Sequence, residues 1–331
     1  MAQNKKNRII SFLHSFAIIG IVIWHAQAIS GSSFLMDWLY TFVLPVMFFA
    51  SGYLFNEKDF WKKKSRRILL PYLAFSTLVF FPKVLLSQFA LRPVELSWQS
   101  YFHQLVIDPT ENVMITLWFL PALFIIMLLF RLLRIVFHKM KLERYRRILL
   151  AALYVCCGAY YGITIEDDLF YSRIALYLPV FILGHEMKTR NRCTAPFKHD
   201  YGLAAAGLVV TAMVAFVDNN HSWPYLFFMP IGTAMTIAFA SIYERNGWRF
   251  LDHLHGAHMS IYLFHWFVQT VVIAIFRKVS GESPALVYII VFQAFAIVGG
   301  IYIPLLLHRA MNGCKKNPLM KCLRIISGIK A

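Results

Sequence analysis

The sequence predicts an all-α integral membrane protein of about ten transmembrane helices with both termini in the cytoplasm, and three observations support this fold class. Of the 331 residues, 59% are hydrophobic and 15% are charged, and the mean hydropathy is +0.59. Soluble domains carry about 45–50% apolar and roughly 25% charged residues. Apolar runs of about 20 residues, the length that crosses a bilayer, recur along the whole chain. The basic residues collect on alternate connections, which sets the orientation.

Polar breaks divide the apolar sequence into ten spans of about 16–24 residues each. The first is expected to remain in the chain rather than be cleaved as a signal peptide, because its apolar stretch has full transmembrane length. We therefore expect one transmembrane domain over residues 1–331 and no soluble domain. The expected spans are residues 9–30, 37–55, 69–88, 113–133, 147–164, 172–187, 201–218, 223–243, 257–277 and 285–308.

The charge distribution follows the positive-inside pattern when the N-terminus is placed in the cytoplasm. Most of the 33 Lys and Arg residues then lie on the cytoplasmic side, which accounts for the net charge of +17 without a nucleic-acid partner. The five cysteines fall inside a span or in cytoplasmic segments, so we expect no disulfide framework. The basic residues expected outside are Lys83, Arg92, Arg173, Arg277 and Lys278.

Two histidines occupy the first span, in the stretch FLHSFAIIGIVIWHAQA. His14 and His25 are eleven residues apart, which places them within about 20° of one helix face and about 16 Å apart along the axis. Ionisable side chains inside a span are costly and normally face the bundle interior or a wet cavity. The alternative is that each histidine only hydrogen-bonds a neighbouring helix. Two on one face favour a functional site.

A second stripe of polar rings lies near the C-terminus. His255, His258, Tyr262 and His265 are spaced 3, 4 and 3 residues apart, on one side of a helix. We expect no metal, because no carboxylate or cysteine lies on the same stripe. His265 is the better functional candidate, because it is the deepest and must be desolvated, and Tyr262 is a substrate-binding candidate.

A basic run, Lys62 to Arg67, precedes the third span. Contact with anionic membrane lipids explains most of these residues. Lys64 and Arg67 are also candidates for an anion site, with Arg67 expected to turn inward. Ser51-Gly52 permits close helix approach, and Trp118 fits an interfacial aromatic belt. The connection 89–112 is expected on the outer side as a lid or acceptor-facing element.

The order of these motifs resembles the membrane acyltransferase 3 family, and within it the short, single-domain O-acetyltransferases of bacterial surface polysaccharides. The likeness runs from about residue 8 to 310. The resemblance implies a multi-pass protein of the bacterial inner (cytoplasmic) membrane that moves an acyl group, usually acetyl, from acyl-CoA to a hydroxyl of a glycan or lipid-linked sugar. The motifs are H-x10-H, FFASGYLF, KKxxRRILLPYL, LWFLPALF, YLPVFILGHEM and MSIYLFH.

The resemblance also implies roles for individual residues. His25 matches the family's essential histidine, whereas His14 stands where the family usually has Arg. Lys64 and Arg67 match the paired basic residues before the third helix. The remaining motif positions are occupied by Ser51, Gly52, Trp118 and His265, and of these Ser51 and Trp118 are expected to bind substrate.

The expected chemistry is general-base catalysis, worth roughly 10²–10⁴-fold. His25 would remove the hydroxyl proton, His14 and Arg67 would position the donor, and His265 would orient or donate to the thioester oxygen. Acetyl-CoA is expected as a co-substrate, with no permanently bound cofactor. Direct transfer and an acetyl-His25 relay both remain open.

Two other functional classes fit intramembrane histidines. One is a proton-coupled transporter. It is weakened by the lack of an inverted repeat or of paired Gly/Pro-broken helices. The other is a histidine-based pH sensor without chemistry.

Overall fold

The computed structural model describes residues 2–31, 33–85, 97–164, 170–189, 199–213, 225–280, 285–314 and 316–329. Every regular element within these residues is helical, as the sequence predicts. The chain divides into two compact units, of which the first comprises Met1–Phe55 with Pro179–His308 and the second Asn56–Leu178 with Arg309–Ala331.

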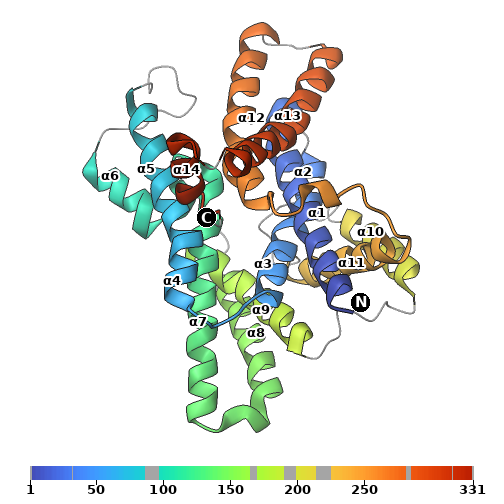
Figure 1. Ribbon diagram of the computed structural model, residues 1–331. Helices are drawn as coiled ribbons and strands as arrows, with labels where there is room; N and C mark the ends of the chain where they lie inside the picture. The colour runs from blue at the N-terminus through green and yellow to red at the C-terminus, as the bar shows by residue number, and fades with distance from the viewer. Residues whose placement is uncertain are drawn as a thin grey trace. The chain divides into compact units, whose positions relative to one another are not determined.

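The first unit is built around the N-terminal helix α1, which packs against α3, α11 and α12. Helices α12 and α13 run beside each other as a hairpin (Figure 1), and Gly299 of α13 lies against Val268 of α12. The helices of this unit are α1 (Ala2–Ser30), α2 (Ser33–Tyr40), α3 (Val43–Tyr53), the second half of α9 (Phe170–Thr189), α10 (Asp200–Ala212), α11 (Tyr225–Arg245), α12 (His258–Ser280) and most of α13 (Leu286–Gly313).

Ion pairs tie the end of α11 to its neighbours. Arg8 of α1 pairs with Glu244 at 2.7 Å and donates to the Trp248 carbonyl at 3.0 Å. Arg245 pairs at 2.8 Å with Asp200, which is buried at the start of α10. A buried carboxylate needs such a partner, because removing it from water is costly. These contacts fix one end of α1, from which the histidine-bearing face extends.

The second predicted span consists of two helices rather than one. Helix α2 ends at Tyr40 and α3 begins at Val43. Pro45 has no N–H to donate to the Thr41 carbonyl, and the loss of this hydrogen bond weakens the helix at the point where it is interrupted. The Tyr40 carbonyl accepts instead from the Tyr225 hydroxyl at 2.6 Å. Together the two helices still form an apolar segment, Phe34–Tyr53, that is long enough to cross a membrane.

Helices α3 and α9 touch backbone to backbone through two glycines. A Cβ on Gly52 would clash with the Phe181 carbonyl, and one on Gly184 would clash with the Phe49 carbonyl. This confirms the close helix approach predicted at Ser51-Gly52, since only a residue without a side chain fits there.

The second unit contains the basic run and the C-terminal helix. Helices α7 and α8 form an antiparallel hairpin (Figure 1). Its elements are α4 (Phe60–Lys64), η1 (Ser65–Leu69), α5 (Leu70–Leu85), α6 (Trp98–Phe102), η3 (His103–Ile107), η4 (Pro109–Glu111), η5 (Ile115–Trp118), α7 (Phe119–Lys139), η6 (Leu142–Tyr145), α8 (Arg146–Ile163), the start of α9, the end of α13 and α14 (Pro318–Ile326).

The basic run contains a π-helical turn, η1. The Leu70 amide donates to the Ser65 carbonyl, five residues back. Pro71 explains the wider turn, because it cannot donate to the Arg67 carbonyl as an α-helix would require. The turn therefore lies at the expected anion-binding segment.

A helix lies within each of the ten predicted spans, with ends shifted by a few residues. Six of the described helical segments are long and apolar enough to cross a membrane, and Ile148–Ile163 and Asp200–Ala212 are shorter apolar helices. The number of crossings and the cytoplasmic termini therefore stay predictions. Residues 86–88, 214–218 and 223–224 of the predicted spans, together with Arg92 and Cys193, lie outside the described residues. The other four cysteines are free.

Candidate active site

The centre of the candidate site is a pair of histidines on α1 and α12. The rings of His25 and His265 lie with their centroids 5.4 Å apart and their planes inclined by 43°. His265 is fully buried and His25 is half-buried. The Trp24 ring meets the His25 ring edge-on at 4.7 Å. The pair therefore joins a fully buried imidazole to a half-buried one.

Backbone carbonyls determine the tautomer of His265. Its Nδ1 lies 2.9 Å from the Ile261 carbonyl oxygen and 2.8 Å from that of Tyr262. Carbonyl oxygens only accept hydrogen bonds, so Nδ1 carries the proton and donates. In the neutral ring Nε2 then bears a lone pair, and this buried atom has no hydrogen-bond partner among the described residues. Neutral His265 can thus accept a proton or a hydrogen bond at Nε2, but it cannot donate there.

The second predicted histidine of α1 belongs to a separate cluster, the inner histidine cluster of His14, His255, His258 and His308. His14 stacks on His258 at 5.5 Å between centroids, and His255 lies 6.4 Å from His258. The polar stripe predicted on α12 is therefore divided. His258 faces His14, His265 faces His25, and His255 precedes the helix.

Hydroxyl groups and a carbonyl hold the inner histidine cluster. Ser11 bonds His255 at 2.7 Å, Ser15 bonds His258 at 2.9 Å and Ser260 bonds His308 at 2.8 Å. His14 Nδ1 donates to the Ile10 carbonyl at 3.1 Å. The sequence did not predict these serines or His308, because no motif distinguishes them. The only available signal was the four-residue spacing of Ser11 and Ser15, which places both on one face of α1. No group of three or more potential ligands among the described residues is placed to hold a metal ion.

The basic run belongs to the second unit. Lys64 is half-buried. Arg67 is exposed rather than turned inward as expected, and Ile68 is the buried residue of the π turn. Lys63 pairs with Asp59 at 2.7 Å, and this ammonium holds the pKa of the Asp59 carboxyl below its usual value. Lys63 is thereby less suited to bind an anion than the basic residues that follow it.

The other predicted residues fall in three places. Trp118 is buried beneath the Arg173 guanidinium, which lies 4.7 Å from its ring centre, a geometry typical of a cation–π contact rather than of an exposed aromatic belt. Tyr262 is buried, with its ring 6.4 Å from that of His265. Ser51 is half-buried on α3, beside the glycine contact with α9.

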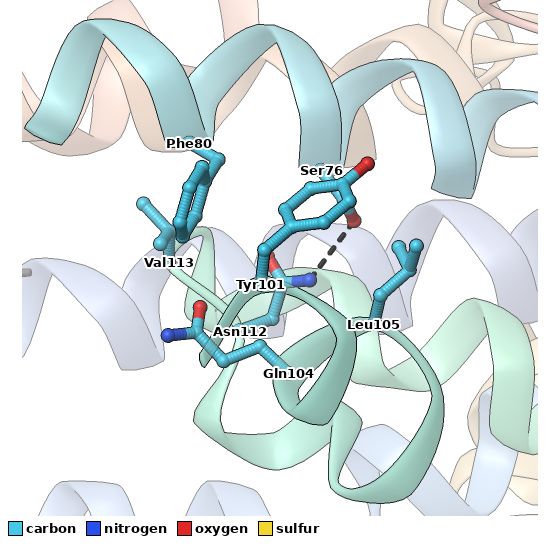
Figure 2. A pocket seen from close by; sticks show the side chains of 7 residues that line it. All are labelled: Ser76, Phe80, Tyr101, Gln104, Leu105, Asn112 and Val113. Carbon is cyan, nitrogen blue, oxygen red and sulfur yellow. Dashed lines mark hydrogen bonds between the residues drawn. The ribbon is translucent and has the colours of Figure 1, made fainter. Parts of the chain in front are cut away.

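A small hollow in the second unit is not a substrate site (Figure 2). Its empty space is about 160 Å³, below the roughly 300–1,000 Å³ of ligand pockets. The Asn112 amide donates to Ser76 at 2.9 Å, and the Tyr72 hydroxyl donates to the Leu105 carbonyl at 2.7 Å. The described part of the connection 89–112, from residue 97 onward, is thus pinned to α5. Residues 89–96 lie outside the described residues.

The fold and the site define a multi-pass helical membrane protein with paired histidines between helices α1 and α12. The family model of acyltransferase 3, described as an acyltransferase domain, matches residues 7–309, which includes parts of both units. The chain therefore belongs to the membrane acyltransferase 3 family and is an acyltransferase, as the motifs predicted. No curated protein and no solved structure matches the chain.

Proposed function

We propose that the protein transfers an acetyl group from cytoplasmic acetyl-CoA to a hydroxyl of a surface polysaccharide or lipid-linked glycan in the bacterial inner membrane. The observation that carries this proposal is the His25–His265 pair, because it supplies a general base next to a buried imidazole of defined tautomer. A sugar hydroxyl is a poor nucleophile at neutral pH and needs such a base.

The roles within the pair follow from the tautomer of His265. A lone pair on Nε2 of His265 accepts an N–H of His25 once the rings close up by a small side-chain rotation. That hydrogen bond leaves the other nitrogen of His25 as the free base, in the way that the aspartate of a serine-protease triad orients its histidine. His265 is therefore assigned as the positioning residue, and the alternative role of donor to the thioester oxygen does not suit its neutral form.

The reaction begins when His25 takes the proton of the acceptor hydroxyl as its oxygen attacks the thioester carbonyl. The new C–O bond forms, and the tetrahedral intermediate then expels the coenzyme A thiolate by breaking the C–S bond. The proton passes from His25 to this sulfur, so that the products are the acetyl ester and the thiol. In the relay alternative His25 first attacks the thioester carbonyl itself, the C–S bond breaks to release the coenzyme A thiol, and the acceptor hydroxyl then displaces the imidazole from the acetyl group.

The donor is assigned to the basic and histidine-rich segments. Coenzyme A carries several negative charges, and Arg offers bidentate geometry to phosphate. Lys64 at the end of α4 and Arg67 on the π turn are proposed to bind these phosphates. His14 is proposed to position the donor from the inner histidine cluster.

The test is an acetyl-transfer assay on the full-length protein in lipid nanodiscs. Purified protein is incubated with [¹⁴C]acetyl-CoA and the glycan fraction of the membranes in which it naturally resides. We expect label in the glycan and free thiol in equal amounts. Uptake of a solute into proteoliposomes without acetyl transfer would contradict the proposal and favour a transporter.

A further inference from the structure

The four rings of the inner histidine cluster come together from helices α1, α12 and α13 and from the turn before α12. His14 stacks on His258 at 5.5 Å between centroids, and His255 lies 6.4 Å from His258. His258 is within electrostatic range of all three other members, including His308 of α13. His14, His258 and His308 are half-buried, whereas His255 is exposed and lies outside the apolar spans. The cluster therefore continues from the helix interior to the surface of the first unit.

The Ile10 carbonyl determines the tautomer of His14. Nδ1 of this ring lies 3.1 Å from the carbonyl oxygen, which only accepts hydrogen bonds, so Nδ1 carries the proton and Nε2 bears a lone pair in the neutral ring. Among the described residues Nε2 has no hydrogen-bond partner. Neutral His14 can therefore only accept at Nε2, and protonation turns the same atom into a positively charged donor.

A proton on His14 has no acidic partner among the described residues. No ion pair described there joins a carboxylate to His14, His255 or His258. Helix α3 carries no charged residue, and the basic residues of α12 are in its last turn. The charged side chains of the neighbouring segments pair among themselves or are exposed: Arg8 with Glu244 and Asp252, Arg249 with Asp252, Arg245 with Asp200, and the exposed Arg309. These groups do not compensate a proton on His14, which the neighbouring rings oppose once they are charged, and an external anion can.

The start of α12 favours an anion at the same place. His258 is the first residue of this 23-residue helix. The first N–H groups of a helix carry a partial positive charge, which attracts anions and repels an uncompensated histidinium. Ser11 and Ser15 hold His255 and His258 through hydroxyls, and a hydroxyl donates to a neutral ring nitrogen or accepts from a protonated one. The cluster therefore accepts a proton and an anion together more readily than a proton alone.

We propose that the inner histidine cluster is an anion site in which His14 takes up a proton together with a phosphate group of coenzyme A, so that the donor binds more tightly as the cytoplasmic pH falls. This inference rests on the proposed function. Histidine is the side chain that changes its charge near neutral pH. The bound phosphate favours the protonated ring, and the protonated Nε2 of His14 donates to it.

The direction of the pH dependence follows from linkage, because the phosphate and the proton favour each other's binding by the same factor. The dissociation constant of coenzyme A is then lowest at acidic pH. It rises by at most about tenfold for each pH unit while the free site is neutral and the occupied site is protonated. A phosphate monoester gains negative charge as the pH rises through about 6. Titration of the ligand alone would thus give the opposite trend.

Two substitutions at His14 separate the charge of its side chain from its presence. His14→Arg carries a permanent positive charge, whereas His14→Gln stays neutral and can still donate to the Ile10 carbonyl. The control is His253→Gln, because His253 is exposed and stacks on the Tyr302 ring at 5.9 Å, outside the cluster. The three variants therefore test a permanent charge, no charge and an unrelated histidine.

The experiment measures the Kd of tritiated coenzyme A by equilibrium dialysis against the full-length protein in phosphatidylcholine nanodiscs, whose neutral lipids keep the surface potential constant. For the wild type and His253→Gln we expect Kd to rise roughly five- to tenfold from about pH 6.5 to about pH 7.5. His14→Arg should keep Kd within about twofold over this range and bind more tightly than the wild type at the higher pH. His14→Gln should bind weakly at both values, also within about twofold.

Two outcomes overturn the proposal alone. One is a wild-type Kd that stays constant or falls as the pH rises, and the other is a His14→Gln protein that keeps the wild-type pH dependence. Absence of coenzyme A binding by the wild type at every pH overturns the assigned donor and the proton uptake together. Because binding is measured without acetyl transfer, pH-dependent binding by a protein that transfers no acetyl would overturn the proposed reaction and support the anion site.

Discussion

The His25 and His265 rings lie 5.4 Å apart although 240 positions separate them in the sequence. The same two helices also bring His14 to 5.5 Å from His258. The interface between α1 and α12 therefore carries two histidine pairs, and only the first includes a fully buried ring. The proposed function assigns the chemistry to the first pair and donor binding to the second.

Replacement of His265 by Asn should lower kcat by roughly 10–100-fold, part of the 10²–10⁴ that general-base catalysis supplies. Asn can still donate to the Ile261 and Tyr262 carbonyls, but it lacks an acceptor at the position of Nε2. His265→Gln places an amide oxygen near that position and should retain more activity. The measurement is acetyl transfer at saturating substrates.

The control for this comparison is His253→Gln, because His253 is exposed and stacks on Tyr302 outside both histidine pairs. Its kcat should stay within twofold of the wild type. A His265→Asn protein as active as this control would contradict the positioning role.

The contact between His14 and His258 should appear as energetic coupling in donor binding. His14→Ala and His258→Ala should each raise the KM for acetyl-CoA about tenfold, and the double variant should raise it by less than the product. Groups in contact show interaction energies of about 0.5–3 kcal/mol. If the KM changes of the two single variants multiply in the double variant, or if only kcat changes, the inner histidine cluster does not bind the donor as proposed.

Gly52→Ala should destabilise the protein by roughly 1–3 kcal/mol, as overpacking does, because the added Cβ meets the Phe181 backbone. Gly202 provides the control, since nothing lies within 4 Å of a Cβ at that helical position. Gly202→Ala should be neutral or stabilising by about 0.5–1 kcal/mol. Thermal unfolding in detergent measures both, and equal shifts would argue against the α3–α9 contact.

Gly328→Ala should loosen the C-terminal segment that follows α14. Gly328 has a φ of +65°, and a Cβ there would lie 2.8 Å from the Arg67 carbonyl oxygen and 2.9 Å from Pro71. The left-handed conformation alone costs roughly 1–2 kcal/mol for a residue with a side chain. We expect faster tryptic cleavage after Lys321 and Arg324 in this variant. Gly313→Ala is the control, because nothing lies within 4 Å of a Cβ at that position. Equal cleavage rates in the two variants would contradict the contact between Gly328 and the Arg67–Pro71 segment.

The positions of the helices could be predicted from the sequence, because the length of each apolar run and the basic residues that flank it mark the spans. Interruptions within the helices were predicted less well. Pro45 signals the interruption between α2 and α3, but the long apolar pattern around it outweighed that signal. The π turn before α5 was not predicted, because it depends on Pro71 acting on a carbonyl four residues earlier, within an otherwise regular helical pattern.

The site was predicted in part. Helical periodicity alone placed His14 and His25 on one face and His265 at depth. The pairing across α1 and α12 could not be predicted, because the register between two helices depends on their packing and not on either sequence alone.

The most direct test of the central claim is the rate of acetyl transfer by His25→Gln in nanodiscs, with His253→Gln as the folded control. General-base catalysis predicts a loss of roughly 10²–10⁴-fold in kcat, with an acetyl-CoA KM within about threefold of the wild type. A His25→Gln protein that transfers acetyl at the wild-type rate would contradict the assignment of His25 as the base.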